Sequence, residues 1–217
     1  FYSVGGASNT TRTGQEACEP GHYCQGGIKQ ECGSVGVYCP EGSAQPVRVD
    51  PGFYSVGGAS NTTRTGQEAC EPGHYCQGGI KQECGSAAVF CVAMASAPSS
   101  VQSGYYSTGG TSNTTRQGQS ICEQGHYCLD GLRFTCPEDQ FATTSGSLAC
   151  SVPRNGQYIV NASAGDLEAV DELRDCEPGY FCENGVRTQC ENGTYADEPG
   201  ASFCKLADRG YYTNSTK

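Results

Sequence analysis

The sequence predicts a small disulfide-rich fold, an elongated tandem array of cysteine-rich modules with short β-strands, irregular loops and little helix. Three observations predict it. The chain has 217 residues, and 16 of them are cysteines. The cysteines form four groups of four, each spaced C-x5-C-x7-C and followed by a fourth cysteine. An aromatic pair also recurs about every 52 residues, and a period of this size is typical of stacked repeats.

The aromatic pair sets the limits of the repeats. Its starts at residues 1, 53, 105, 157 and 211 predict repeats 1–52, 53–104, 105–156 and 157–210, with 211–217 opening a fifth. Residues 1–34 and 53–86 are identical. Either a recent duplication or the copying of one repeat onto another during sequence assembly accounts for this identity. Since the chain starts at Phe1 without a secretion signal, we expect it to be a segment of a longer precursor.

Composition excludes an ordinary apolar core. The chain has 31 Gly, no Trp and one Met, and its mean hydropathy is -0.49. A repeat of this length with few aliphatic residues buries too little surface to hold itself together. Disulfides, each contributing about 2–4 kcal/mol, supply the missing stability. We expect the Tyr and Phe rings to pack on them.

All sixteen cysteines are expected in disulfides inside their own repeats. Four cysteines allow three pairings. A C-x5-C pair on a partly extended strand is too far apart to join easily, so we favour first-to-third and second-to-fourth pairing, with the others left open. The alternative is a reduced, metal-binding protein, but the sequons described below favour an oxidising, extracellular or cell-surface location. The cysteines are Cys18, Cys24, Cys32, Cys39, Cys70, Cys76, Cys84, Cys91, Cys122, Cys128, Cys136, Cys150, Cys176, Cys182, Cys190 and Cys204.

Local signals predict the elements of each repeat in order. The Gly-, Ser-, Thr- and Asn-rich stretch after the aromatic pair favours turns and short strands. Pro20-Gly21 predicts a chain reversal, after which Tyr23 begins a strand. In repeat 4, residues 165–173 carry Leu167, Val170 and Leu173 three apart, which predicts one short helix. Residues 46–51 are expected to form a stiff linker, and the Ser/Ala-rich residues 93–104 could carry O-linked sugar.

Six N-x-S/T sequons predict N-glycosylation. Three of them share one phase of the repeat, which makes a chance origin less probable than for a single sequon. Their loops are polar and rich in Gly and Thr, so the acceptor is expected to be exposed. An unmodified polar turn is the alternative for each. The acceptors are Asn9, Asn61, Asn113, Asn161, Asn192 and Asn214.

The sequence offers no catalytic, cofactor or metal site. His22 lies among cysteines at spacings that zinc could use, but Tyr180 replaces this histidine in repeat 4 while the cysteines remain. The acidic run 166–172 lacks the spacing of a calcium loop and is expected to be a solvated helix face. We therefore expect a non-enzymatic protein. The net charge of -10 weighs against a nucleic-acid partner, so we expect none, and no apolar run is long enough for membrane insertion.

The unit C-x-P-G-x-Y…G…C resembles the cysteine-rich repeats of the ephrin-receptor-like and tumour-necrosis-factor-receptor-like type, and Cys136 to Cys150 is similar to one such unit. Unlike many of those units, the repeats here have no cysteine before the aromatic pair. In tandem, with sequons between the cysteine groups, the pattern is similar to large surface proteins of protists and algae, such as flagellar-hair (mastigoneme) and extracellular glycofibril proteins. This resemblance implies a secreted structural glycoprotein that self-associates into a filament. The alternative is a stalk or ligand-binding ectodomain of a cell-surface receptor or adhesion protein.

Overall fold

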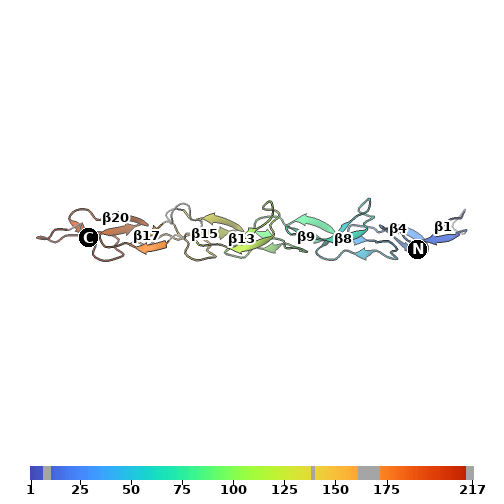
Figure 1. The fold of residues 1–217 in the computed structure, drawn as a ribbon, viewed down its shortest axis with the longest axis horizontal. Helices are drawn as coiled ribbons and strands as arrows, with labels where there is room; N and C mark the ends of the chain where they lie inside the picture. Colours follow the sequence, from blue (N-terminus) through green and yellow to red (C-terminus); the bar gives the residue numbers. More distant parts are fainter. Residues whose placement is uncertain (7–10, 138–139, 161–171, 214–217) are drawn as a thin grey trace. The chain divides into compact units, whose positions relative to one another are not determined.

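The computed structural model of the chain describes residues 1–6, 11–137, 140–160 and 172–213. They form two-stranded antiparallel sheets joined by turns, and none of them lies in an α-helix (Figure 1). Eight disulfides link these small sheets. The predicted fold class of small, disulfide-rich tandem modules is confirmed. Within the described part of the chain, no helix is long and apolar enough to cross a membrane.

Three strand pairs follow one another in repeats 1, 2 and 4, and two in repeat 3. The front hairpins are β1 (Tyr2–Val4) with β2 (Gly14–Glu16), β7 (Phe53–Val56) with β8 (Gly66–Ala69), β13 (Tyr105–Thr108) with β14 (Gly118–Ile121), and β17 (Gln157–Val160) with β18 (Glu172–Asp175). The middle hairpins are β3 (His22–Gln25) with β4 (Ile28–Glu31), β9 (His74–Gln77) with β10 (Ile80–Glu83), β15 (His126–Leu129) with β16 (Leu132–Thr135), and β19 (Tyr180–Glu183) with β20 (Val186–Gln189). The distal pairs are β5 (Val37–Tyr38) with β6 (Val47–Arg48), β11 (Val89–Phe90) with β12 (Ser99–Ser100), and β21 (Thr194–Tyr195) with β22 (Lys205–Leu206). In repeat 3 a single antiparallel bridge between Phe141 and Ser151 takes the distal place.

The middle hairpins turn through two residues of positive φ. Gly26 and Gly27 have φ of 60° and 78°, and Asp130 has φ of 51°. Two-residue hairpin turns need this left-handed backbone, which Gly, Asn and Asp adopt most readily. The front hairpin joins the middle hairpin by a parallel bridge, as between Tyr54 and Gly79.

Sulfur and small side chains occupy the interior. Among the described residues, the largest fully buried side chains are all cysteines. In repeat 2, Cys84, Cys91 and Ala95 form a buried cluster against which Tyr75 and Val89 pack. This contact confirms for Tyr75 the expectation that aromatic rings pack on the disulfides.

The disulfide pairing favoured from the sequence is wrong. Consecutive cysteines pair instead, first with second and third with fourth, as in Cys18–Cys24 and Cys32–Cys39. The reason is the turn between the first two cysteines. Gly21 has φ of 85° and His22 N donates to Glu19 O at 3.1 Å, so the chain reverses and the Cα atoms of Cys18 and Cys24 come within 5.8 Å. The other pairs are Cys70–Cys76, Cys84–Cys91, Cys122–Cys128, Cys136–Cys150, Cys176–Cys182 and Cys190–Cys204.

Two further sequence expectations need correction. The helix expected over 165–173 does not include its last two residues, because Glu172 and Leu173 belong to β18 and Leu173 pairs with Ile159. The remainder of that stretch lies outside the described residues. The expected linker at 46–51 contains β6, which pairs with β5, so Val47 and Arg48 belong to the body of repeat 1.

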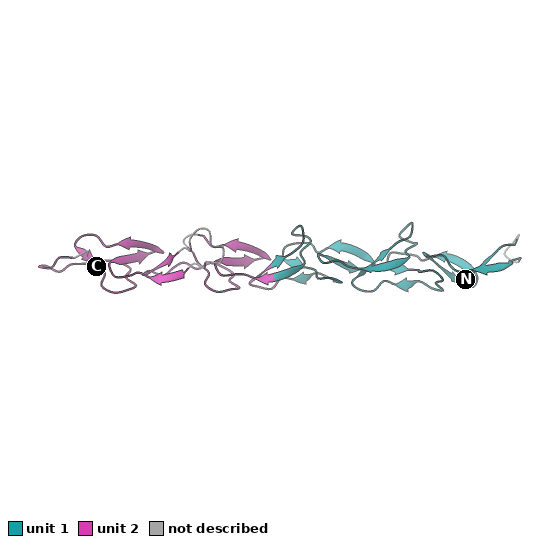
Figure 2. Cartoon of the chain, in the orientation of Figure 1, with its two compact units in different colours: residues 1–101, 107–119 teal, residues 102–106, 120–217 magenta. Residues whose placement is uncertain are grey.

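Contacts divide the chain into two compact units, residues 1–101 with 107–119, and residues 102–106 with 120–217 (Figure 2). The 52-residue period is visible in the sequence and in the order of the strands, whereas the residues at which each repeat begins and ends remain a prediction.

Candidate functional site

The loops that carry the phased sequons have an ordered local structure. Asn61 lies between β7 and β8 and is exposed, and its Oδ1 accepts a hydrogen bond from Arg64 Nη2 at 2.7 Å. Asn113 is also exposed, and its Oδ1 accepts from Arg116 Nη2. The sequon threonine closes the turn, since Ser60 N donates to Thr63 Oγ1 at 3.0 Å. Each asparagine is thus held by its amide oxygen, while glycosylation takes place at the amide nitrogen.

The same loop docks on the preceding repeat through its main chain. Gly33 N donates to Thr62 O and Cys39 N donates to Arg64 O, both at 2.9 Å. One repeat further on the pattern recurs. There Gly85 N donates to Thr114 O at 3.0 Å, and Cys91 N donates to Arg116 O at 2.9 Å. Consecutive repeats in this part of the chain are therefore joined by one repeated backbone contact, which we call the loop junction.

The loop junction requires glycine on the receiving side. A Cβ on Gly21 would lie 2.5 Å from Thr63 O, and a Cβ on Gly73 would lie 2.5 Å from Thr115 O. Both glycines also have positive φ, 85° and 88°. Any other residue would push the docked loop away. The Pro-Gly signal read from the sequence as a turn therefore also marks a site of close contact between repeats.

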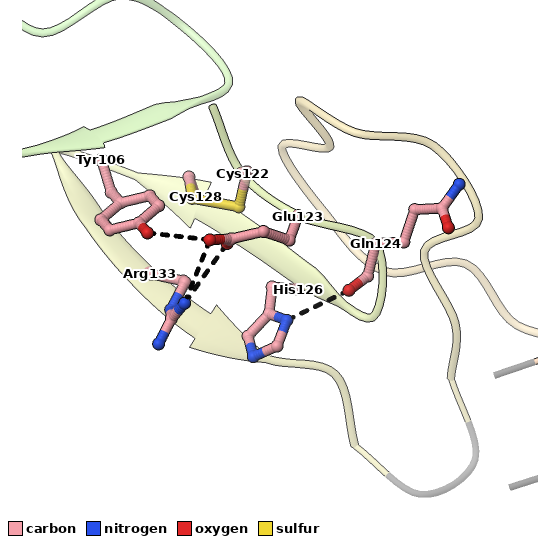
Figure 3. A network of polar contacts seen from close by, with 7 residues as sticks. All are labelled: Tyr106, Cys122, Glu123, Gln124, His126, Cys128 and Arg133. Atoms are coloured by element: carbon pink, nitrogen blue, oxygen red, sulfur yellow. Dashed lines mark hydrogen bonds and ion pairs between the residues drawn. A yellow bond between two sulfur atoms is a disulfide. The ribbon is translucent and has the colours of Figure 1, made fainter. Parts of the chain in front are cut away.

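A polar cluster holds the front and middle hairpins of repeat 3 together (Figure 3). Tyr106 on β13 donates its hydroxyl to Glu123 Oε1 at 2.9 Å. Arg133 on β16 donates from Nη1 to both carboxylate oxygens of Glu123 at 3.3 Å, and its guanidinium lies 5.1 Å from the centroid of the Tyr106 ring. Glu123 directly follows Cys122, so the Cys122–Cys128 disulfide fixes the carboxylate between its two donors.

The cluster recurs in every repeat. The carboxylate–cation pairs are Glu19–Lys29, Glu71–Lys81, Glu123–Arg133 and Glu177–Arg187, and the tyrosines are Tyr2, Tyr54, Tyr106 and Tyr158. In repeat 2 the tyrosine hydroxyl donates to Glu68, on β8, instead of to the carboxylate after the cysteine. We call each set a Tyr–Glu–cation cluster.

The clusters shift the pKa values of their members. The hydrogen bond from Lys29 lowers the pKa of Glu19 and raises that of Lys29. Burial tends to raise the pKa of Glu123, but hydrogen bonds from its backbone amide, Tyr106 and Arg133 outweigh it, and the pKa is lowered. The pKa of Tyr158 is raised, first by its hydrogen bond to Glu177. These partners all lie inside one repeat, so the shifts are accounted for by contacts that stabilise the fold.

Sequence reasoning missed the Tyr–Glu–cation clusters. A signal for them exists, because each repeat places a glutamate directly after its first cysteine and a lysine or arginine ten residues later. Recurrence of these residues with the repeat does not reveal the cluster, because residues that recur in every repeat need not contact one another. Only the parallel bridge between front and middle hairpins shows that the tyrosine meets the pair.

The structure describes only some of the remaining glycosylation sites and acidic residues predicted from the sequence. Asn192 is exposed in the turn before β21. Asn9, Asn161 and Asn214 lie outside the described residues, as do Asp166, Glu168 and Asp171 of the acidic run. Glu172 lies in β18 and pairs with Arg174 at 2.6 Å.

The histidines and cysteines do not come together as metal ligands. His22 shares β3 with Cys24, but the sulfurs of Cys18, Cys24 and Cys32 are all in disulfides, and a disulfide sulfur is not a thiolate ligand. In repeat 3, His126 Nδ1 lies 3.2 Å from the backbone oxygen of Gln124 (Figure 3). In the described part of the chain, no three residues of the His, Cys, Asp or Glu type are grouped so as to hold a metal ion.

No protein-family model matches the chain, and a search of curated proteins finds no match either. The repeated cysteine-rich architecture therefore stands on the chain's own sequence and structure. Its eight disulfides are typical of proteins that fold in an oxidising compartment and work outside the cell or at its surface.

Proposed function

We propose that the chain is a structural, non-catalytic part of an extracellular fibril or flagellar-hair-like filament, stabilised by disulfides and covered with N-glycans. The observation that carries the proposal is the loop junction. Thr62 docks on Gly33 and Thr114 docks on Gly85 with the same geometry. A contact that is the same from one repeat to the next lets an array grow without a closed end.

Covalent closure of every repeat supports a mechanical role. Each repeat has its own two disulfides, so the failure of one repeat does not release its neighbours. The Tyr–Glu–cation cluster adds a second connection across each repeat, although an exposed ion pair of this kind contributes little to stability. The polar atoms of these clusters satisfy one another, which supports a structural role rather than a catalytic one.

The test is direct imaging of native material by negative-stain electron microscopy. Long uniform fibres with a regular repeat are the expected result. Isolated particles that persist at high protein concentration would contradict filament formation. Glycosidase treatment followed by peptide mass analysis tests the sugar coat. A mass loss is expected at the peptides of Asn61 and Asn113, with Asn61→Gln and Asn113→Gln chains as controls, and unchanged masses would remove the glycans from the proposal.

A second candidate function is the stalk or ligand-binding ectodomain of a surface receptor. One observation favours it. The middle hairpin of repeat 3 exposes Leu129 and Phe134, to 54 % and 40 %, where repeat 2 has glutamines at 77 and 82. An exposed aromatic that stands at this position of the middle hairpin in one repeat alone is what a unique binding hot spot requires.

A further inference from the structure

The middle hairpin of repeat 3 has an apolar face. The register of β15 and β16 places Tyr127 opposite Phe134 and Leu129 opposite Leu132. Opposite residues and their second neighbours along a strand share a face, so all four side chains lie on one side of the hairpin. The rings of Tyr127 and Phe134 stack at a centroid distance of 5.2 Å. Leu129, Leu132 and Phe134 remain 54 %, 37 % and 40 % exposed. We call these four residues the repeat 3 face.

The other repeats have polar residues at the positions of Leu129 and Phe134. In repeat 2 the equivalent set is Tyr75, Gln77, Ile80 and Gln82, and Tyr75 Oη donates to Gln82 Oε1 at 3.1 Å. Repeat 1 has the same residues with the same bond at 3.0 Å, between Tyr23 and Gln30. Phe134 therefore replaces a hydrogen-bonded glutamine. The stacking on Tyr127 takes the place of the hydrogen bond, and Phe134 still leaves apolar surface in water at 40 % exposure.

Charge is directed away from the repeat 3 face. Arg133 lies between Leu132 and Phe134 in sequence and so points to the opposite side of the hairpin, where it binds Glu123. The turn residue Asp130 is the nearest acidic group along the chain. The face is thus uncharged in a chain whose net charge is -10.

We propose that the repeat 3 face is the lateral contact through which the chain pairs with a second copy of itself, an inference that rests on the proposed filament function. An uncharged two-stranded face is self-complementary, because under a two-fold axis each apolar side chain meets an apolar side chain of the other copy. It offers no charge pattern that would select a different partner. Burying the rings and leucines against a second copy removes them from water, which is the driving force.

The period of the chain also favours a second copy as the partner. Every repeat exposes one aliphatic residue at the position of Leu132. These residues are Ile28, Ile80, Leu132 and Val186, exposed to 64 %, 49 %, 37 % and 63 %. A copy of this chain carries the same aliphatic residue in its own middle hairpins, so a hairpin of one copy can meet the same residue of the other. Repeat 3 adds Leu129 and Phe134 to this residue, which makes its hairpin the preferred place of contact.

The small area of the repeat 3 face limits the association constant of two free chains. A few partly exposed side chains fall well short of the roughly 800 Å² per partner of a standard stable interface. Pairing of two free chains is therefore weak and needs high protein concentration, whereas in a filament many such contacts add up. Like-charge repulsion between copies opposes the contact, so pairing strengthens as salt screens it.

Sedimentation equilibrium of the full chain at increasing protein and salt concentration tests the proposal. The double variant Leu129→Gln, Phe134→Gln copies the residues of repeat 2, which that hairpin accommodates, and its association constant is expected to fall at least tenfold. The reciprocal variant Gln77→Leu, Gln82→Phe builds a second face and is expected to associate at least tenfold more strongly. Peptide mapping of the disulfides verifies the fold of both variants.

Three results would overturn the proposal. They are a wild-type chain that stays monomeric under all conditions, equal association of wild type and the glutamine variant, and a reciprocal variant with no gain. A monomeric chain that binds an unrelated ectodomain through Leu129 and Phe134 would overturn it in favour of the receptor function. Imaging separates this test from that of the proposed function. Fibres formed by the glutamine variant would support the filament function and contradict the lateral contact. Pairing of wild-type chains in solution without any fibres would support the lateral contact and contradict the filament function.

Discussion

The loop junction predicts that Gly73→Ala uncouples repeat 3 from repeat 2. Gly73 has φ of 88°, a conformation that costs an L-residue about 1–2 kcal/mol. The new Cβ would also stand 2.5 Å from Thr115 O, which is main chain and cannot rotate away. The docked loop must move, and this breaks the bonds that Gly85 N and Cys91 N donate to it at 3.0 and 2.9 Å. Each is worth about 0.5–1.5 kcal/mol, so the total cost is about 2–5 kcal/mol.

A matched control separates backbone strain from the lost contact. Gly78 in the same repeat has φ of 60°, and no described atom lies within 4 Å of a Cβ built on it. Asn184, the equivalent residue of repeat 4, has φ of 52°, so a side chain fits this turn. Gly78→Ala should therefore cost only the strain, about 1–2 kcal/mol.

Hydrogen exchange read by mass spectrometry is the assay, because unfolding of an array need not be two-state. In Gly73→Ala the amides of Gly85 and Cys91 should exchange about 5- to 150-fold faster, since the two lost bonds correspond to about 1–3 kcal/mol and each 1.4 kcal/mol is tenfold. In Gly78→Ala these two amides should keep their wild-type rates. Equal protection of Gly85 and Cys91 in the two variants would refute the argument that the junction depends on close backbone contact.

Three further predictions address single contacts. Partial reduction and peptide mapping should find the consecutive pair Cys136–Cys150, and replacing both cysteines with serine should cost about 3 kcal/mol in the free energy of unfolding, the value for a 15-residue loop; a Cys122–Cys136 peptide would contradict the pairing. Met94 has φ of 60° where repeats 1, 3 and 4 have glycine, so Met94→Gly should raise the urea midpoint by relieving up to about 1 kcal/mol of strain, and a lower midpoint would contradict this. The pKa of Glu123 is lowered in the folded chain, so its contribution to the free energy of unfolding is present above the unfolded pKa and is lost as pH falls through the folded pKa. The wild-type chain should therefore be more stable than Glu123→Gln at pH 7 and lose this advantage in acid. A difference in the free energy of unfolding that stays constant from pH 7 to pH 2 would contradict the cluster.

Much of the fold could be predicted from the sequence because its determinants are local. The spacing of cysteines and the stride of aromatic pairs predict tandem disulfide-rich modules, and Pro20-Gly21 predicts the turn that the structure shows. The pairing could not be predicted from that spacing alone. A C-x5-C segment is long when extended and short when reversed, and only the geometry of the turn at Gly21 brings Cys18 to Cys24.

The contacts between segments were less predictable. The loop junction depends on backbone atoms of Thr62 and Arg64, which leave no side-chain signature. The Tyr–Glu–cation cluster does have a sequence signature, but the contact of the tyrosine with the ion pair can be recognised only once it is known which hairpins lie side by side. The repeat 3 face could be recognised only from the register of β15 and β16. Side chains alternate between the two sides of a strand, and the position of the hairpin turn decides that Leu129 and Phe134 share one side while Arg133 lies on the other.

The second disulfide of the repeats closes in two ways, and the backbone explains why both fit. Gly21 N donates to Cys39 O at 2.7 Å, and Gly125 N donates to Ala142 O at 2.8 Å, so Ala142 occupies the place of Cys39. Ala142 is buried there, at 6 % exposure. Further along, Cys24 N donates to Ser43 O and Cys128 N donates to Ser147 O, both at 2.9 Å. Counting on from these two serines, Cys150 takes the place of Pro46, which precedes β6. Because the matched hydrogen bonds use main-chain atoms alone, they hold the path of the chain whichever position carries the sulfur. The cysteine can therefore move along the distal loop, from 7 to 14 residues after its partner, while the frame around it stays the same.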